Sequence, residues 1–208
     1  MVRDKRFERI REGIYQELLK ANQHFKICWG IRRASQDIAR AIRVHLAFFH
    51  FTMWSNNDRF CLGVYNVVKP DDDTANFTKL FNYVRSSRHL SALLLEEKQD
   101  IREMEQKIES HRELIDRIKV IRDQYVAHIQ LTRKHLEGAA TYTYEEGKTL
   151  LVDLNDILRN VSRAYDRNLY WRDGDGLLDV SPSVNVDYVL RSLTERYEDG
   201  IRRRQGLA

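Results

Sequence analysis

Apolar residues recur at helical spacing along almost the whole chain, and few residues interrupt them. Only two prolines and nine glycines occur among the 208 residues. Because proline and glycine are the strongest breakers of regular structure, their scarcity favours long helices. The one strand-like stretch, residues 141–144, is too short and has no partner. We therefore expect an all-α fold, a bundle of five to seven helices with one long helix or helical hairpin.

Several expected helices can be followed by their apolar stripes. The first stripe consists of Phe7, Ile10, Ile14, Leu18, Ala21 and Phe25. A second begins after a possible cap at Ser35 and contains Ile38, Ile42, Phe49, Met53, Phe60, Cys61, Val64, Tyr65 and Val68. Because it broadens to several sides, it is typical of the central helix of a bundle. The acidic run 71–73 then suits the N-terminus of a short helix that contains Phe77, Leu80, Phe81 and Val84.

Residues 90–137 form the longest expected helical stretch. Apolar residues repeat there every seven positions, at Leu94, Ile101, Ile108 and Ile115. This spacing favours a coiled-coil contact or a long antiparallel hairpin arm. A break near 109–112 remains an alternative, although no Gly or Pro marks one. Beyond a loop at 138–144, Thr143 and Glu146 have the spacing of a capping box for a further helix.

The domain organisation is expected to be simple. Residues 1–172 form the helical bundle, and 173–208 add a loop and a helix that pack on the same domain. The N-terminus lacks the apolar core of a signal peptide, and the longest apolar run, 46–54, is too short to cross a bilayer. Cys28 and Cys61 lie in apolar patterns without zinc-ligand spacing, which indicates buried thiols in a reducing compartment. We expect a cytoplasmic protein without a membrane segment, metal or cofactor.

The most informative polar residues are Arg122, Asp123 and His128. An imidazole with a pKa of about 6.5 can accept a proton from a ribose 2′-hydroxyl or donate one to a leaving 5′-oxygen. A guanidinium can neutralise the charge of a pentacoordinate phosphorus, and Asp123 can orient either group. On a straight helix Arg122 and His128 are about 240° apart, so the Arg side chain leans over or the helix bends. The alternative is a surface Arg–Asp pair beside a histidine at the edge of the core.

The string IRDQYVAHIQ at 121–130 resembles the R-x(4–6)-H signature of the HEPN superfamily. Residues 43–52, Asp58 and the acidic turn 71–73 are similar to its AbiU-type abortive-infection branch, so the resemblance spans residues 7–170. It implies a helical bundle that forms a homodimer, with two motifs facing one another across a cleft. It also implies a metal-independent endoribonuclease that acts on RNA as a toxin or phage-defence effector, with an antitoxin protein as a possible partner. The catalytic residues would be Arg122, Asp123 and His128.

Other residues are candidates for supporting roles. Asp58 could position the motif arginine, and Tyr125 could support the same site. Tyr125, Tyr142 and Tyr144 could also stack on unpaired bases. Basic residues flank the motif and would follow an RNA backbone if they lined one groove. They are Arg117, Lys119, Arg133 and Lys134. The net charge of +4 and the isoelectric point near 9.0 are compatible with RNA but, taken alone, are more typical of an ordinary soluble surface with mixed charges.

Two further clusters favour structural interpretations. His45 and His50 are about 140° apart on a helix, which is poor for a shared metal. The string at 173–176, DGDG, lacks the later ligands of a calcium loop and indicates a turn. A different function is also open: the heptad-like stretch 94–118 suits a catalytically inert dimerisation or partner-binding module.

Overall fold

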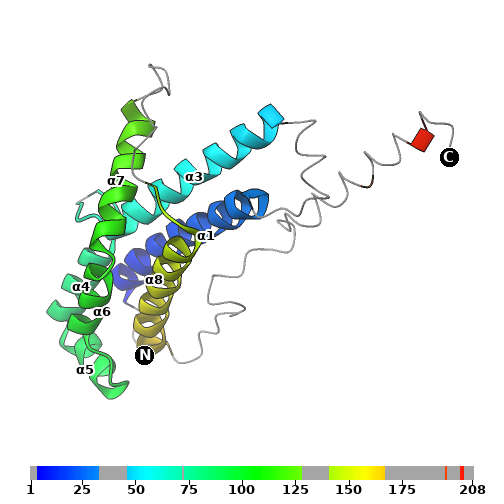
Figure 1. Cartoon of the computed structure of the whole chain (residues 1–208). Helices are drawn as coiled ribbons and strands as arrows, with labels where there is room; N and C mark the ends of the chain where they lie inside the picture. The colour runs from blue at the N-terminus through cyan, green and yellow to red at the C-terminus, as the bar shows by residue number, and fades with distance from the viewer. Residues whose placement is uncertain are drawn as a thin grey trace. The chain divides into compact units, whose positions relative to one another are not determined.

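The computed structural model describes residues 4–32, 46–71, 73–127 and 141–166, together with 195, 202 and 203. These residues contain seven α-helices and no strand (Figure 1). The helices are α1 (Lys5–Arg32), α3 (Leu46–Val68), α4 (Phe77–Ser86), α5 (Arg88–Glu96), α6 (Ile101–Glu109), α7 (Arg112–Ala127) and α8 (Tyr144–Tyr165). The expected all-α class is therefore confirmed. No helix in the described ranges is long and apolar enough to cross a bilayer.

The chain divides into two compact units, which are described separately. The first contains residues 4–22 and the described residues from 58 to 166. The second contains residues 23–32 and 46–57 with the three isolated C-terminal positions. Both α1 and α3 therefore contribute to each unit. The candidate site lies wholly in the first.

In the first unit α1 and α3 run antiparallel and approach closely. Asn66 of α3 donates from Nδ2 to Glu17 Oε2 at 3.3 Å. One turn earlier on α3, a Cβ added to Gly63 would lie 3.1 Å from the Cβ of Ala21. Later residues of α1 thus meet earlier residues of α3. The small side chains at this crossing let α3 bury its broad apolar face, as its sequence pattern predicts.

In the second unit the same two helices meet through polar groups. His24 Nδ1 and Asn56 Oδ1 are 2.7 Å apart, and Arg32 Nε donates to Met53 Sδ at 3.4 Å. Phe48 and Phe51 of α3 stay 63% and 71% exposed. This unit therefore carries apolar surface that the described residues do not cover.

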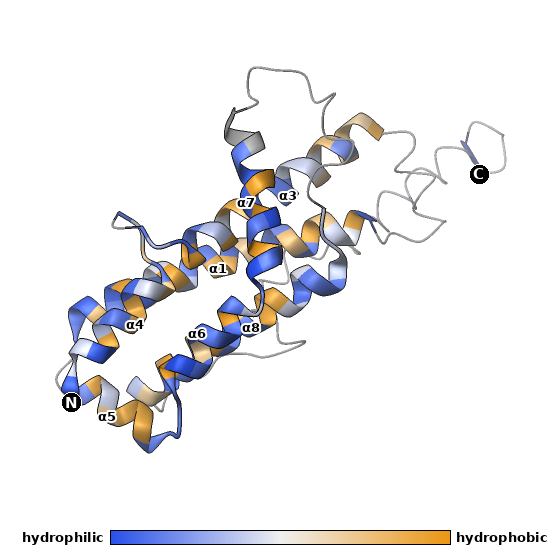
Figure 2. Cartoon of the chain, turned by 60° about the vertical axis from the view of Figure 1, so that its left-hand side comes forward, coloured by the Kyte–Doolittle hydropathy of each residue, from blue (hydrophilic) through white to orange (hydrophobic). Residues whose placement is uncertain are grey.

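The helix α8 supplies the largest continuous part of the core. Its expected apolar face is buried, and it packs against α5 and α6. The buried members of that face are Leu150, Leu151, Leu154, Ile157, Leu158, Val161 and Tyr165. Figure 2 shows apolar and polar residues interspersed along the helices, as amphipathic helices require. Both cysteines are buried thiols rather than halves of a disulfide, as expected.

The described part of the long stretch 90–137 is divided into most of α5, all of α6 and all of α7. The break between α6 and α7 falls at Ser110 and His111, where the sequence left one open. His111 Nε2 lies 2.7 Å from Asp153 Oδ2 on α8, and Lys107 Nζ lies 2.7 Å from Asp153 Oδ1. These contacts attach the turn between α6 and α7 to α8. The heptad positions are therefore spread over three helices, and the longest described helix is α1, with 28 residues.

The helix α4 begins later than the acidic run suggests, and the expectation that this run lies at its N-terminus is wrong. Asn76 is the N-cap, and its side chain accepts a hydrogen bond from the Lys79 backbone N–H. Asp71 instead accepts from the Asp73 backbone N–H at 2.9 Å and pairs with Lys69. The bond from Asp73, followed by that from Lys69, lowers the pKa of Asp71. An asparagine cap competes well with a carboxylate for this position.

Candidate active site

Arg122 continues the buried stripe of α7. Leu114 and Ile118 are 5% and 0% exposed, and Arg122 follows at the same spacing of four residues. Side chains four positions apart lie on one face of a helix, so Arg122 is directed toward the neighbouring helix rather than into solvent. Only 20% of its side chain is exposed. A charged residue thus occupies a position where the helix pattern calls for an apolar one.

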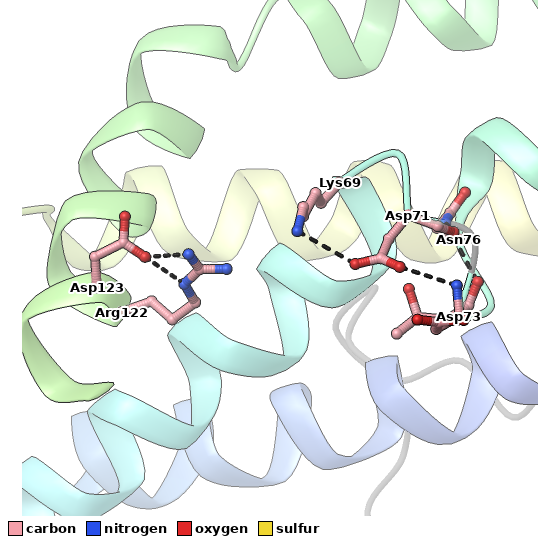
Figure 3. A network of polar contacts seen from close by, with 7 residues as sticks. Lys69, Asp71, Asp73, Asn76, Arg122 and Asp123 are labelled. Atoms are coloured by element: carbon pink, nitrogen blue, oxygen red, sulfur yellow. Dashed lines mark hydrogen bonds and ion pairs between the residues drawn. The ribbon is translucent and has the colours of Figure 1, made fainter. Parts of the chain in front are cut away.

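Two groups fix the guanidinium of Arg122. Its central carbon lies 3.8 Å from the centroid of the Tyr65 ring on α3, which is a cation–π contact. Its Nε donates to Asp123 Oδ1 at 2.8 Å, and its Nη2 donates to the same oxygen. Figure 3 shows the Arg122–Asp123 pair on α7, with the guanidinium directed toward α3. The ring therefore restrains the guanidinium from α3, and the carboxylate restrains it from α7.

This arrangement leaves much of the donor capacity of Arg122 for a ligand. A guanidinium has five N–H groups in a fixed fork, and those of Nε and one of Nη2 are directed to Asp123. Among the described residues, no partner is recorded for the two N–H groups of Nη1 or the second of Nη2. A pair of parallel N–H groups matches two oxygens of a phosphate. Such an edge is chemically suited to an anion.

The structure brings together only part of the predicted motif. Arg122 and Asp123 lie side by side on α7, and Asp123 is 48% exposed. His128, Arg133 and Lys134 lie outside the described residues. Tyr125 belongs to α7, but its side chain is outside the described part as well. The expectations for these four side chains remain predictions.

Asp58 lies on the same face of α3 as Tyr65. The two are seven residues apart, which is two helical turns and about 10 Å along the axis. Within the described residues, the partners of the Arg122 guanidinium are Asp123 and Tyr65. Tyr65 is thus the residue of α3 recorded in contact with Arg122, and the supporting role of Asp58 stays a prediction. The sequence analysis assigned Tyr65 only to the core, and no local signal distinguishes it from the other aromatic residues of α3.

The flanking cations have different surroundings. Arg117 donates to the Thr141 carbonyl at 2.8 Å and to Glu146 Oε1 at 2.5 Å, so it holds the start of α8. Lys119 is exposed and lies three residues before Arg122, on the neighbouring part of the same helix surface. Lys119 is thus the described flanking residue that is best placed to meet an RNA backbone.

A further cation that the sequence analysis did not select lies near the site. Lys69 Nζ is 6.0 Å from the Tyr65 centroid and 3.2 Å from Asp71 Oδ2. Figure 3 shows this ion pair on the right, at the end of α3, and the Arg122–Asp123 pair on the left. The Tyr65 ring therefore has two positive side chains near it, at 3.8 and 6.0 Å from its centroid.

Where the structure describes them, the other chemical candidates form no second site. His50 is exposed on α3, whereas His45 and the turn at 173–176 lie outside the described residues. Over the ranges 4–32, 46–71, 73–127 and 141–166, no three side chains of the metal-ligating types come together.

No family model, no curated protein and no solved structure matches the chain. The fold places it in the broad class of all-helical bundles. Its distinguishing feature is an arginine held between a carboxylate and a buried ring.

Proposed function

We propose that the chain is a metal-independent endoribonuclease of the HEPN type, which acts on RNA as a toxin or phage-defence effector. The observation that supports this most directly is the guanidinium of Arg122, which Asp123 and Tyr65 orient while its Nη1 edge stays available. His128 follows six residues later in the sequence. The resemblance of 121–130 to the R-x(4–6)-H signature supplies the reaction class.

The reaction is transfer of a phosphoryl group to a neighbouring ribose oxygen. The His128 imidazole removes the proton of the 2′-hydroxyl, whose oxygen then bonds to phosphorus. The bond from phosphorus to the 5′-oxygen breaks, and an imidazolium protonates that oxygen. The products are a 2′,3′-cyclic phosphate and a 5′-hydroxyl. Arg122 neutralises the charge that accumulates on the phosphate oxygens in the transition state.

A homodimer completes this mechanism. Proton removal and proton donation are required at once, and one imidazole cannot do both in the same step. A two-fold axis through the motif brings a second His128 and a second Arg122 to the same phosphate. We therefore include a homodimer and an RNA substrate in the proposal, with a cytoplasmic location and an antitoxin protein as a regulator.

A catalytically inert partner-binding module is the second candidate. Its original support, the heptad-like stretch 94–118, is weakened because α5, α6 and α7 are separate helices. A different observation favours it: Phe48 and Phe51 expose large apolar surfaces on one side of α3. Exposed apolar surface is typical of interaction sites. The two candidates differ in whether RNA is cut.

The test compares RNA cleavage by wild type, Arg122→Ala and His128→Ala in the presence of EDTA. The control is Arg112→Ala, since Arg112 lies on the same helix but is 64% exposed and pairs only at the surface, with Glu109 and Asp116. We expect wild type and control to cut single-stranded RNA and leave cyclic or 3′-phosphate ends. Each site variant should lose about 100-fold or more in rate.

Two results would overturn the nuclease. One is a folded His128→Ala protein that cuts as fast as wild type, and the other is loss of cleavage on addition of EDTA. Expression in a bacterial host gives an independent measurement. A toxic wild type beside a harmless Arg122→Ala variant supports the nuclease, whereas equal growth with intact RNA supports the inert module.

A further inference from the structure

We propose that Tyr65 is a positioning residue for the reaction, because its ring holds the Arg122 guanidinium in the plane that meets the scissile phosphate. The inference rests on the proposed nuclease function and extends it to a residue outside the motif. Tyr65 belongs to α3, 57 positions before Arg122 in the sequence. The two residues meet only because α3 and α7 pack together in the first unit.

The ring of Tyr65 is itself held firmly. It is 8% exposed and belongs to the most deeply buried part of α3. The neighbouring buried side chains of this helix are Phe60, Cys61, Val64 and Val67, each 0% exposed. Close packing of this kind leaves an aromatic ring few alternative orientations. A guanidinium stacked on it at 3.8 Å therefore loses the freedom that a long arginine side chain otherwise has.

Asp123 alone would hold Arg122 less securely. It lies on the same helix and is 48% exposed, so water competes for its hydrogen bonds to the guanidinium. The contact with Tyr65 comes from a different helix and from a buried face. It therefore ties the arginine to the core of the unit rather than to a neighbouring surface residue.

An aromatic ring is also chemically suited to this task. A second carboxylate would restrain Arg122 by occupying its remaining N–H groups and cancelling its charge. The ring attracts the cation through its π face and uses none of the N–H groups. The guanidinium thus stays restrained while its Nη1 edge keeps its donors for phosphate oxygens. Tyr65 therefore restrains the Arg122 side chain without competing with the substrate for its N–H groups.

The experiment measures RNA cleavage by Tyr65→Leu and Tyr65→Phe. The Leu variant removes the ring, whereas the Phe variant retains the stacking face and loses only the hydroxyl. We expect kcat to fall about 10- to 100-fold in the Leu variant, as for other small displacements of a reacting group, with KM changed less than about threefold. The Phe variant should retain most of the wild-type kcat. Phe60→Leu is the matched control, since it also removes a fully buried ring from α3. The Phe60 ring contacts Tyr142 rather than Arg122.

A second measurement follows Arg122 itself. The Nε–Hε resonance of Arg122 in NMR spectra, assigned with Arg122→Lys, should be displaced by the ring current in wild type and in Tyr65→Phe. In Tyr65→Leu it should lose the ring-current displacement and keep only the effect of the hydrogen bond to Asp123. If the Leu variant does not fold, Tyr65→Met removes the ring but supplies a longer, flexible side chain that can fill the irregular space.

The outcomes separate the two proposals. If Arg122→Ala cuts RNA like wild type, the nuclease proposal fails and the role of Tyr65 fails with it. If Arg122→Ala is inactive but the ring-less variants keep the wild-type kcat, only the inference about Tyr65 is overturned. An Arg122 resonance that is the same with and without the ring also overturns it. Loss of kcat in the ring-less variants, with rescue by Phe and an active Phe60→Leu control, supports it.

Discussion

Arg117 of α7 and Glu146 of α8 form an ion pair of 2.5 Å that fixes the first turn of α8. Glu146 is also the second half of the capping box, because its carboxylate accepts the Thr143 backbone N–H at 2.7 Å. The bond from Arg117, followed by the bond from Thr143, lowers the pKa of Glu146 from 4.5 to about 2. The pair therefore makes the stability of the protein dependent on pH in the acid range.

We expect Glu146→Gln to lower the free energy of unfolding by about 0.5–1 kcal/mol at pH 7, a modest value because the pair is partly exposed. The carboxyl group has a lower pKa in the folded than in the unfolded chain. Its stabilisation is therefore complete above about pH 5 and is lost as the pH falls toward 2. Urea unfolding of wild type and variant at several pH values between 2 and 7 measures this. Glu109→Gln, at an exposed pair with Arg112, should show little difference, and a gap that persists at pH 2 contradicts the prediction.

Asn22 and Asn155 should be energetically coupled. Each side-chain amide donates to the oxygen of the other, at 3.3 and 3.2 Å, and both residues are buried. Each single change to alanine should cost about 1–3 kcal/mol, because it leaves a buried amide without its partner. The double variant should cost less than the sum by at least about 0.5 kcal/mol. Urea unfolding of the four proteins decides this, and strictly additive values would show that the pair is not coupled.

Gly13→Ala should destabilise the protein, although alanine normally favours a helix by about 1 kcal/mol over glycine. A Cβ at this position would lie only 2.5 Å from the Cβ of Ala75, in the loop before α4. Relief of such an overlap costs about 1–3 kcal/mol in packed regions. Thermal unfolding monitored by circular dichroism measures the loss. Adding Ala75→Gly should recover most of it, and a stabilised Gly13→Ala protein would show that the loop yields freely.

Asp123→Ala should impair RNA cleavage because the in-plane restraint on Arg122 is lost. We expect a decrease of about 10-fold in kcat, and a smaller one for Asp123→Asn, which retains an accepting oxygen. Asp116→Ala is the control, since Asp116 is an exposed carboxylate on the same helix that pairs with Arg112. Single-turnover cleavage rates measure the effect. Equal cleavage rates for Asp123→Ala and Asp116→Ala would show that Asp123 has no role in the reaction.

Lys119→Ala should weaken RNA binding in a manner that depends on salt. If Lys119 contacts one phosphate, the slope of log affinity against log salt concentration should become less steep by about 0.7. The control is Lys20→Ala, since Lys20 is an exposed lysine of α1 that pairs with Glu17. Filter binding of catalytically inactive Arg122→Ala protein, with and without each change, measures the slopes. Identical slopes for the Lys119 and Lys20 changes would exclude the phosphate contact.

Features that depend on neighbouring residues could be predicted from the sequence. The buried faces of α1, α4 and α8 follow from the spacing of apolar residues. The capping box follows from a threonine and a glutamate three positions apart, Thr143 and Glu146. The end of α6 was only one alternative, because the turn at Ser110 and His111 contains neither glycine nor proline. It is held by the contact of His111 with Asp153, 42 residues further on. The start of α4 was misplaced because an asparagine, rather than the acidic run, caps it.

The candidate site shows the same division. Arg122 and Asp123 are adjacent, so their pairing could be expected from the sequence. Tyr65 could not be found in this way, because its role depends on where α3 crosses α7. Its burial in an apolar stripe resembles that of the other aromatic core residues of α3. The cation above the ring is the feature that distinguishes it.

The helices α5 and α6 contain only nine residues each. Peptides of that length have little helix content in water, since isolated helices need about 12–15 residues to be even marginally stable. Both pack on α8, which therefore acts as the template on which they become helical. Amide groups in α5 and α6 should accordingly exchange with solvent whenever α8 detaches, and a ligand that displaced α8 would unwind these two short helices together.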